Sequence, residues 1–271
     1  MSLEGLEPVV DVSVGGWIAE RLRGPVGTVG SVVPTGFAAY ARVLHPVEVS
    51  GDGPAMGWAQ VCTITGRIPH ALMQWTAIAH PAAGSTLSRS QSGLWDQVEV
   101  RVGTLVPETL GVLLDVLEPV TGGQDCFHAL WEGWGWVDGA GMAVLRASTD
   151  GEHPMPASAS APLPGVTPAV WQGPRLRLPG RDYLLFRGPL SAALRMGWQV
   201  DATWFYPQSP SLLWPQDRSW CLATEIDFDS TLVAGSTDLV EAVLAASGLE
   251  AWRVQEGDDL TAFADEINAA P

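Results

Sequence analysis

Residues 220–248 read WCLATEIDFDSTLVAGSTDLVEAVLAASG, and this stretch decides the fold class. The segments WCLATEIDF and TLVAG each predict a β-strand. The segment STDLVEAVLAAS then predicts a helix, with Ser236 as its N-cap and Gly248 directly after its end. Strands and helices follow one another without regular alternation along the chain. The sequence therefore predicts an α+β fold, with a mixed or antiparallel sheet and several flanking helices.

The same kind of pattern predicts the remaining elements. A helix is expected at 11–23, with Asp11 as its N-cap, and two short helices separated at Gly66 are expected within 57–80. Further helices are expected to begin at Pro107 and to span 190–197 and 258–269. Strands are expected at 37–49, 126–137, 141–147, 183–186 and 251–254. Residues 151–174 are rich in Pro, Ala and Ser and predict a linker or a long surface loop. The chain is thus either a single α+β unit over 1–271 or two lobes, 1–150 and 175–271.

The net charge limits the kinds of partner that the protein can bind. The chain has 30 acidic residues and 14 basic ones, all of them Arg, which gives a formal net charge of −16. A field this negative repels phosphate backbones and anionic lipid head groups. We therefore expect no nucleic-acid partner and no membrane surface. The charge favours solubility, and it leaves room for a basic protein partner or a cation.

Three cysteines, Cys62, Cys126 and Cys221, are widely spaced, and no C-x-x-C motif occurs. This spacing argues against both a disulfide framework and a structural zinc site. The start of the chain, MSLEGLEPVVDV, has neither the basic nor the apolar part of a secretory signal. The sequence predicts a cytoplasmic protein with free thiols.

The common catalytic motifs are missing from the sequence. There is no P-loop, no G-x-S-x-G nucleophile elbow and no H-E-x-x-H zinc helix, and GWGWVDG differs from the dinucleotide fingerprint by one residue. The chain lacks lysine, so it cannot form a Schiff base through a lysine side chain. The histidines are expected to be core or capping residues: His45, His70, His80, His128 and His153. We expect no cofactor, with Mg²⁺ or Ca²⁺ as the alternative considered below.

Tryptophan is abundant, with 13 residues in the chain. One cluster comprises Trp131, Trp134 and Trp136 in WEGWGW, and a second comprises Trp204, Trp214 and Trp220. Such residues either pack the core or line an aromatic pocket or interface. The candidate binding residues are Trp131, Trp134, Trp136, Trp204, Trp214 and Arg218.

The acidic residues in ATEIDFDS form the second candidate site. In a strand, Glu225, Asp227 and Asp229 would share one face, about 6–7 Å apart. Three interpretations follow: a solvent-facing strand surface, ion pairs with Arg218 or Arg187, or a site for Mg²⁺ or Ca²⁺. The last would make the protein a divalent-cation-dependent hydrolase that uses these three carboxylates.

The stretch from Ser211 to Val254, SLLWPQDRSWCLATEIDFDSTLVAGSTDLVEAVLAASGLEAWRV, resembles a family of actinobacterial proteins to which no activity is assigned, as does FHALWEGWGW upstream. The resemblance implies a cytoplasmic location and brings no catalytic residues. The chain also resembles SUKH-type immunity proteins in general character, since both are acidic α+β proteins with scattered Trp, but no motif is matched residue by residue. The leading hypothesis is a non-enzymatic binding or interaction protein, for example an inhibitor of a basic partner. The alternatives are the hydrolase and a structural subunit of a homo-oligomer.

Overall fold

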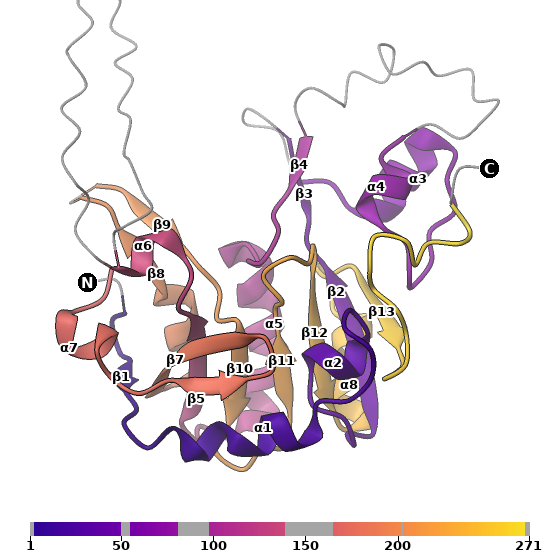
Figure 1. Ribbon diagram of the computed structural model, residues 1–271. Helices are drawn as coiled ribbons and strands as arrows, with labels where there is room; N and C mark the ends of the chain where they lie inside the picture. The colour runs from indigo at the N-terminus through magenta and orange to yellow at the C-terminus, as the bar shows by residue number, and fades with distance from the viewer. Residues whose placement is uncertain (1–2, 50–54, 81–97, 139–164, 202, 269–271) are drawn as a thin grey trace, which may run out of the picture.

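A large antiparallel β-sheet forms the centre of the protein, as the computed structural model in Figure 1 shows. The structure describes residues 3–49, 55–80, 98–138, 165–201 and 203–268. The strands are β1 (Glu7–Pro8), β2 (Ala39–Leu44), β3 (Val47–Val49), β4 (Val98–Val100), β5 (Cys126–Trp131), β6 (Leu176–Leu178), β7 (Arg181–Gly188), β8 (Gly197–Gln199), β9 (Phe205–Pro207), β10 (Leu212–Pro215), β11 (Cys221–Ala223), β12 (Ser230–Gly235) and β13 (Ala251–Val254). The helices are the 3₁₀ helix η1 (Val12–Gly15), α1 (Gly16–Arg21), α2 (Val29–Val32), α3 (Trp58–Thr65), α4 (Trp75–Ile78), α5 (Pro107–Thr121), α6 (Gly135–Asp138), α7 (Pro168–Trp171), the 3₁₀ helix η2 (Leu190–Arg195) and α8 (Thr237–Ala245).

Within the described residues, one sheet contains nine of these strands, in the order β1-β7-β5-β10-β11-β12-β2-β13, with β6 paired to β7. Its pairings are antiparallel. The predicted α+β class is therefore confirmed. Strands from 1–150 are inserted among strands from 175–271, because β5 lies between β7 and β10 and β2 lies between β12 and β13. The sheet thus does not divide at the segment 151–174.

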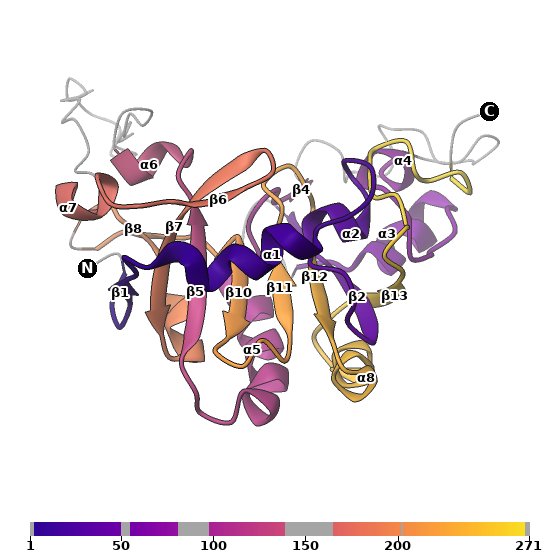
Figure 2. The same cartoon turned by 60° about the horizontal axis from the view of Figure 1, so that its bottom comes forward.

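Helices cover both faces of the sheet. In Figure 2, α1 and α2 cross one face, and α5 and α8 lie on the other. Trp17 of α1 and Trp214 of β10 belong to the first core, whereas Leu113 of α5 and Leu213 of β10 belong to the second. Successive strand residues point to opposite faces, so one short strand supplies both cores.

Local signals placed several elements correctly. The side chain of Asp11 accepts the backbone N–H of Ser13 at 3.1 Å and caps η1. Ser236 accepts the N–H of Leu239 at 3.2 Å and caps α8. Helix α5 begins at Pro107, and α3 ends at Gly66, whose φ of 71° is the left-handed conformation that glycine adopts without strain. Each of these predictions is confirmed.

Two predictions on the described residues are wrong. The expected helix at 258–269 is a series of turns, because its aspartates bond to nearby backbone N–H groups. Asp259 accepts from Thr261, and Asp265 accepts from Asn268, both at 2.8 Å. The strand predicted for WCLATEIDF ends at Ala223. The strand expected at 141–147, His153 and most of the segment 151–174 lie outside the described residues.

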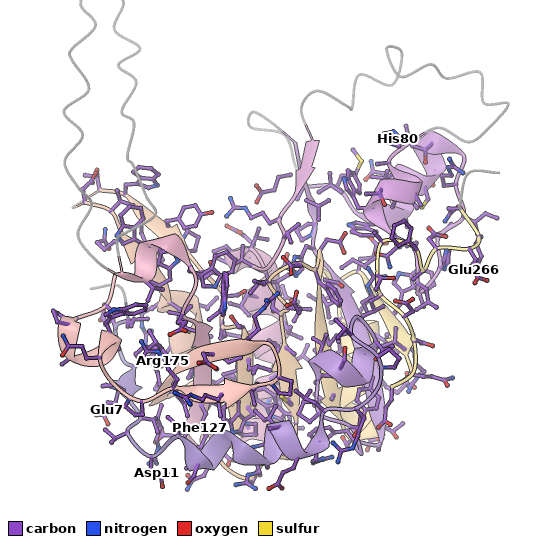
Figure 3. The ribbon with its side chains drawn as sticks, viewed as in Figure 1. Glu7, Asp11, His80, Phe127, Arg175 and Glu266 are labelled. Atoms are coloured by element: carbon purple, nitrogen blue, oxygen red, sulfur yellow. The ribbon has the colours of Figure 1, made fainter. Side chains whose placement is uncertain are left out.

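The C-terminal segment packs beside α3 and α4 at one end of the molecule, and α6, α7, β8 and β9 form the other end (Figure 1). Figure 3 marks the first end by His80 and Glu266 and the second by Arg175. Asp265 holds the C-terminal segment in place by accepting from the ring of His70 at 2.8 Å and from the N–H of Gln74 at 3.2 Å. None of the helices in the described part of the chain has the length and apolar character that a membrane span requires.

Candidate ligand-binding cleft

A cleft of about 560 Å³ lies where β10 begins and β11 ends. One wall is the loop between α1 and α2, and the opposite wall is the turn between β6 and β7. Apolar side chains make up most of these walls: Leu22, Val26, Val32, Leu178, Leu212 and Phe228. This volume and this lining are typical of sites for small molecules, which combine apolar walls with a few polar groups.

The polar end of the cleft is built from Arg181, Glu225 and Asp227. The Arg181 Nη2 atom donates to Glu225 Oε1 at 3.1 Å and to Asp227 Oδ2 at 2.8 Å. The side chain of Arg181 is 31% exposed, that of Glu225 21% and that of Asp227 74%. One guanidinium thus balances two carboxylates, and the group keeps one net negative charge that faces solvent.

Glu225 and Asp227 lie in a turn, which corrects the prediction that they share a strand face. Strands β11 and β12 pair in antiparallel register, with Ala223 opposite Leu232, so the chain reverses between these two residues. The N–H of Asp227 donates to Glu225 Oε2 at 2.5 Å, and the N–H of Phe228 donates to the Glu225 carbonyl at 3.1 Å. Such local bonds stabilise a turn at the expense of an extended strand.

Asp229 points away from this group and into the protein. Its Oδ1 accepts from Arg42 Nη2 at 3.3 Å, and the Arg42 residue is fully buried. Burial raises the pKa of the Asp229 carboxyl, and the nearby guanidinium opposes that rise. Arg42 also donates to the carbonyls of Ala71 and Met73, so this pair attaches the chain that precedes α4 to the sheet.

The three carboxylates therefore do not form the predicted cation site. In the residues that the structure describes, no group of three or more His, Cys, Asp or Glu side chains could hold a metal ion. Ion pairing, one of the three interpretations, is what the structure shows, but the partners are Arg181 and Arg42 in place of Arg218 or Arg187.

Two tryptophans of the first cluster lie close to the polar end of the cleft. The guanidinium of Arg181 lies 5.6 Å from the ring centroid of Trp131, a cation–π contact. The ring of Trp134 meets Trp131 edge-on, with centroids 5.5 Å apart. Gly103 lies between Trp134 and the 225–228 turn: a Cβ there would be 2.9 Å from Trp134 and 2.5 Å from the Ile226 carbonyl oxygen. Trp136, in contrast, is 2% exposed and packs in the core.

The second cluster is dispersed. Trp214 is fully buried and stacks on Phe127 with ring centroids 5.5 Å apart. Trp220 is buried on the opposite face of the sheet, where its Nε1 donates to Thr121 at 3.2 Å. Trp204 is exposed, one residue before β9. The guanidinium of Arg218 lies over the ring of Trp17, 5.6 Å from its centroid. These residues do not converge on the cleft.

A buried row of hydrogen bonds lies behind the cleft, on the opposite face of the sheet. The Thr224 side chain lies on the same face as Leu222, and its hydroxyl is 2.9 Å from that of Thr231. The Thr231 hydroxyl is 2.9 Å from His45 Nε2, and His45 Nδ1 is 2.6 Å from the carbonyl oxygen of Arg101. Burial lowers the pKa of His45 to about 4, so the ring is neutral near pH 7.

Sequence reasoning missed Arg181 as part of this site. The Pro-Gly pair at 179–180 is a turn signal that places Arg181 at the start of β7. Nothing local in the sequence pairs Arg181 with residues more than forty positions away. The expectation that histidines serve the core holds for His45 and His128, which are fully buried.

Comparisons of the chain with protein families, with curated proteins and with solved structures found no match.

Proposed function

We propose that the protein is a binding protein that holds a small amphipathic molecule in the cleft. The apolar part of the ligand lies against Leu212 and Phe228, and its polar part lies at Arg181, Glu225 and Asp227. The observation that carries this proposal is a cleft of about 560 Å³ that combines mostly apolar walls with the ion-paired group of Arg181, Glu225 and Asp227. This combination orients a ligand and excludes water from its apolar part.

The state of the cysteines supports binding over catalysis. The three thiols are buried, and burial raises the pKa of Cys62 to about 11 and that of Cys126 to about 12. A reactive cysteine needs a lowered pKa, because the thiolate is the nucleophile. Buried free thiols also support the proposed cytoplasmic location, since that compartment keeps thiols reduced.

Calorimetric titration with 1-octanol tests the proposal. Burying most of an octyl chain at roughly 0.8 kcal/mol per CH₂, less the cost of association, gives an expected dissociation constant on the order of 0.1–1 mM. The variant Val32→Trp fills the cleft and should weaken binding at least tenfold. The matched variant Val120→Trp adds the same ring to α5, on the opposite face of the sheet, and should bind like the wild type. Equal binding by all three proteins, or none by the wild type, contradicts the proposal.

A second candidate function is recognition of a basic protein partner, an inhibitor-like or immunity-like role. Phe263 is 93% exposed and Ile267 56% exposed, and the exposed carboxylates of Asp259 and Glu266 accompany them on the C-terminal segment. An exposed aromatic ring with an acidic rim suits a basic surface that has an apolar recess. Self-association into a homo-oligomer is less favoured, because a net charge of −16 repels a second copy.

Affinity capture from cell extract with matched baits tests this second candidate. A partner of the predicted kind is retained by the wild type, released at high salt and lost with Phe263→Ser, but it is retained by Val120→Ser. Identical captured proteins for the wild type and Phe263→Ser argue against it. Light scattering on the purified chain separates a homo-oligomer from a monomer.

A further inference from the structure

The wall of the cleft that the α1–α2 loop forms continues into the C-terminal segment, residues 255–268. Val26 of the loop lines the cleft but is 96% exposed, so its side chain stands at the mouth. Thr261 of the C-terminal segment lines the same cleft. The carbonyl of Gly27 accepts the N–H of Leu260 at 2.9 Å, and an antiparallel β-bridge beside this bond also joins the two stretches of chain. The loop and the C-terminal segment therefore form one continuous wall.

Exposed apolar side chains continue from this wall along the C-terminal segment, which runs from α2 to α3 and α4 in Figure 1. The exposed Phe263 lies two residues after Thr261, so their Cα atoms are at most about 7 Å apart. Farther along, Ile267 is exposed, and the next residue, Asn268, bonds both backbone groups of the exposed Ile68 at 2.9 Å. Several large apolar side chains that adjoin a cleft mark an interaction site, whereas single ones do not. These residues form the apolar rim: Val26, Ile68, Phe263 and Ile267.

The charge of the C-terminal segment indicates what can cover the apolar rim. Residues 255–268 contain five acidic residues and no basic one. Two arginines approach the segment from other elements: Arg21 lies near Glu256, and Arg67 donates to the carbonyl of Asn268 at 2.9 Å. The carboxylates of the segment therefore outnumber the guanidinium groups beside them, and the rim favours a partner with positive charge.

The lining of the cleft has no such excess of charge. Arg23 and Arg181 balance Glu225 and Asp227, and the other lining residues are uncharged. The cleft therefore suits an apolar group, while positive charge is favoured outside it, over the C-terminal segment. A free small molecule in the cleft would leave the apolar rim exposed. A second copy of the chain is disfavoured at the rim, because both copies carry a charge of −16.

We infer that the ligand of the cleft is a segment of a basic protein, which inserts an apolar side chain into the cleft and lays neighbouring Arg or Lys residues over the apolar rim. This inference rests on the proposed function and names the class of its ligand. Long basic side chains suit the rim, because their stems are apolar and their charged ends reach the carboxylates. The exposed ring of Phe263 offers its face to such a cation.

Selection of phage-displayed random peptides on the immobilised full chain tests this inference. The enriched peptides should share an apolar residue with Arg or Lys close to it in the peptide sequence. A synthetic copy of the most enriched peptide should bind the full chain in calorimetric titrations, and its affinity should fall as the salt concentration rises. Added 1-octanol, well above its own dissociation constant, should weaken peptide binding several-fold, because both ligands occupy the cleft.

Two substitutions with matched controls locate the bound peptide. Val32→Trp fills the cleft, and Phe263→Ser removes the exposed ring of the rim. Each should weaken peptide binding about tenfold, as the loss of an interface anchor does, and Phe263→Ser should leave 1-octanol binding unchanged. Val120→Trp and Val120→Ser place the same residues on α5, on the opposite face of the sheet, and should bind the peptide like the wild type. If Val32→Trp does not fold, competition by 1-octanol locates the apolar side chain.

The outcomes distinguish the two proposals. Peptide binding that is weakened both by Phe263→Ser and by filling the cleft supports the assignment of a basic protein segment. Peptides that depend on only one of the two sites, or enriched peptides without basic residues, overturn this assignment and leave the binding function standing. Failure to enrich any peptide, while 1-octanol still binds, has the same meaning. Absence of 1-octanol binding overturns the proposed function and the assignment that rests on it.

Discussion

The interior of the sheet and the polar end of the cleft use the same residue types in opposite ways. Inside, Trp214 packs in the core and Arg42 pairs with Asp229; at the cleft, Trp131 contacts Arg181, which pairs with Asp227. Inside, water is excluded, so a lost partner leaves an unpaired charge or a void. At the cleft, water replaces a lost partner. The same residue types therefore stabilise the fold in one region and are free to recognise a ligand in the other.

The sharpest contrast is between the two tryptophans. Trp214→Ala should lower the free energy of unfolding by about 4 kcal/mol, because it opens a cavity beside Phe127 and Trp17. Trp131→Ala should lower it by about 2 kcal/mol, since the ring is only partly buried and its contacts are those with Arg181, Trp134 and the edge of the core. Urea denaturation measures both. Equal losses would remove the distinction between the two regions.

The two arginines give the next largest contrast. Arg42→Met should cost about 3 kcal/mol, because Asp229 and two backbone carbonyls lose a buried partner. Arg181→Met removes a group that is 31% exposed and should cost less than about 1 kcal/mol. The same denaturation assay compares them, and a larger loss for Arg181→Met would show that the cleft is part of the stabilising core.

The two buried histidines, His45 and His128, should make the free energy of unfolding depend on pH between pH 7 and pH 6. Burial lowers the pKa of both His45 and His128 to about 4. Below the ordinary pKa of about 6.5, the unfolded chain binds protons that the folded chain does not, so stability falls as the pH falls. The two rings together should remove about 1.4 kcal/mol from pH 7 to pH 6. His128→Leu should halve this dependence, and an unchanged slope would show that His128 is protonated in the fold.

The smallest expected effect is at the exposed turn. Asp227→Asn should change stability by less than about 0.5 kcal/mol, because its side chain is 74% exposed. The same substitution should change 1-octanol binding less than about twofold, because the apolar walls of the cleft hold the octyl chain. Thermal unfolding and calorimetry measure the two properties separately, and a stability loss above about 1 kcal/mol would contradict the assignment of this turn to the exposed region.

Sequence patterns predicted the elements whose signals are local. Ser236 with its apolar stripe placed α8, Pro107 placed the start of α5, and AWRV placed β13. The strand predicted through Asp227 was wrong, because alternation alone does not show where an antiparallel partner forces the chain to reverse. The acidic pattern of 258–269 likewise did not show that its aspartates would bond to backbone N–H groups.

The candidate site was predicted only in part. Glu225 and Asp227 do line the cleft, and Trp131 does contact its arginine. Arg181 could not be predicted, because its ion pairs join the start of β7 to the turn between β11 and β12, which only the sheet order brings together. That order is a property of tertiary pairing, which no short-range pattern encodes.

The most direct test of the cleft is a titration of ¹⁵N-labelled protein with 1-octanol, followed by NMR through the backbone amides. The account predicts that the shifted signals belong to the cleft walls, including Gly27, Gly180 and Thr224, and that the amides of α5 do not move. Shifts centred on α5 and η2, or no shifts at octanol concentrations well above 1 mM, would contradict it.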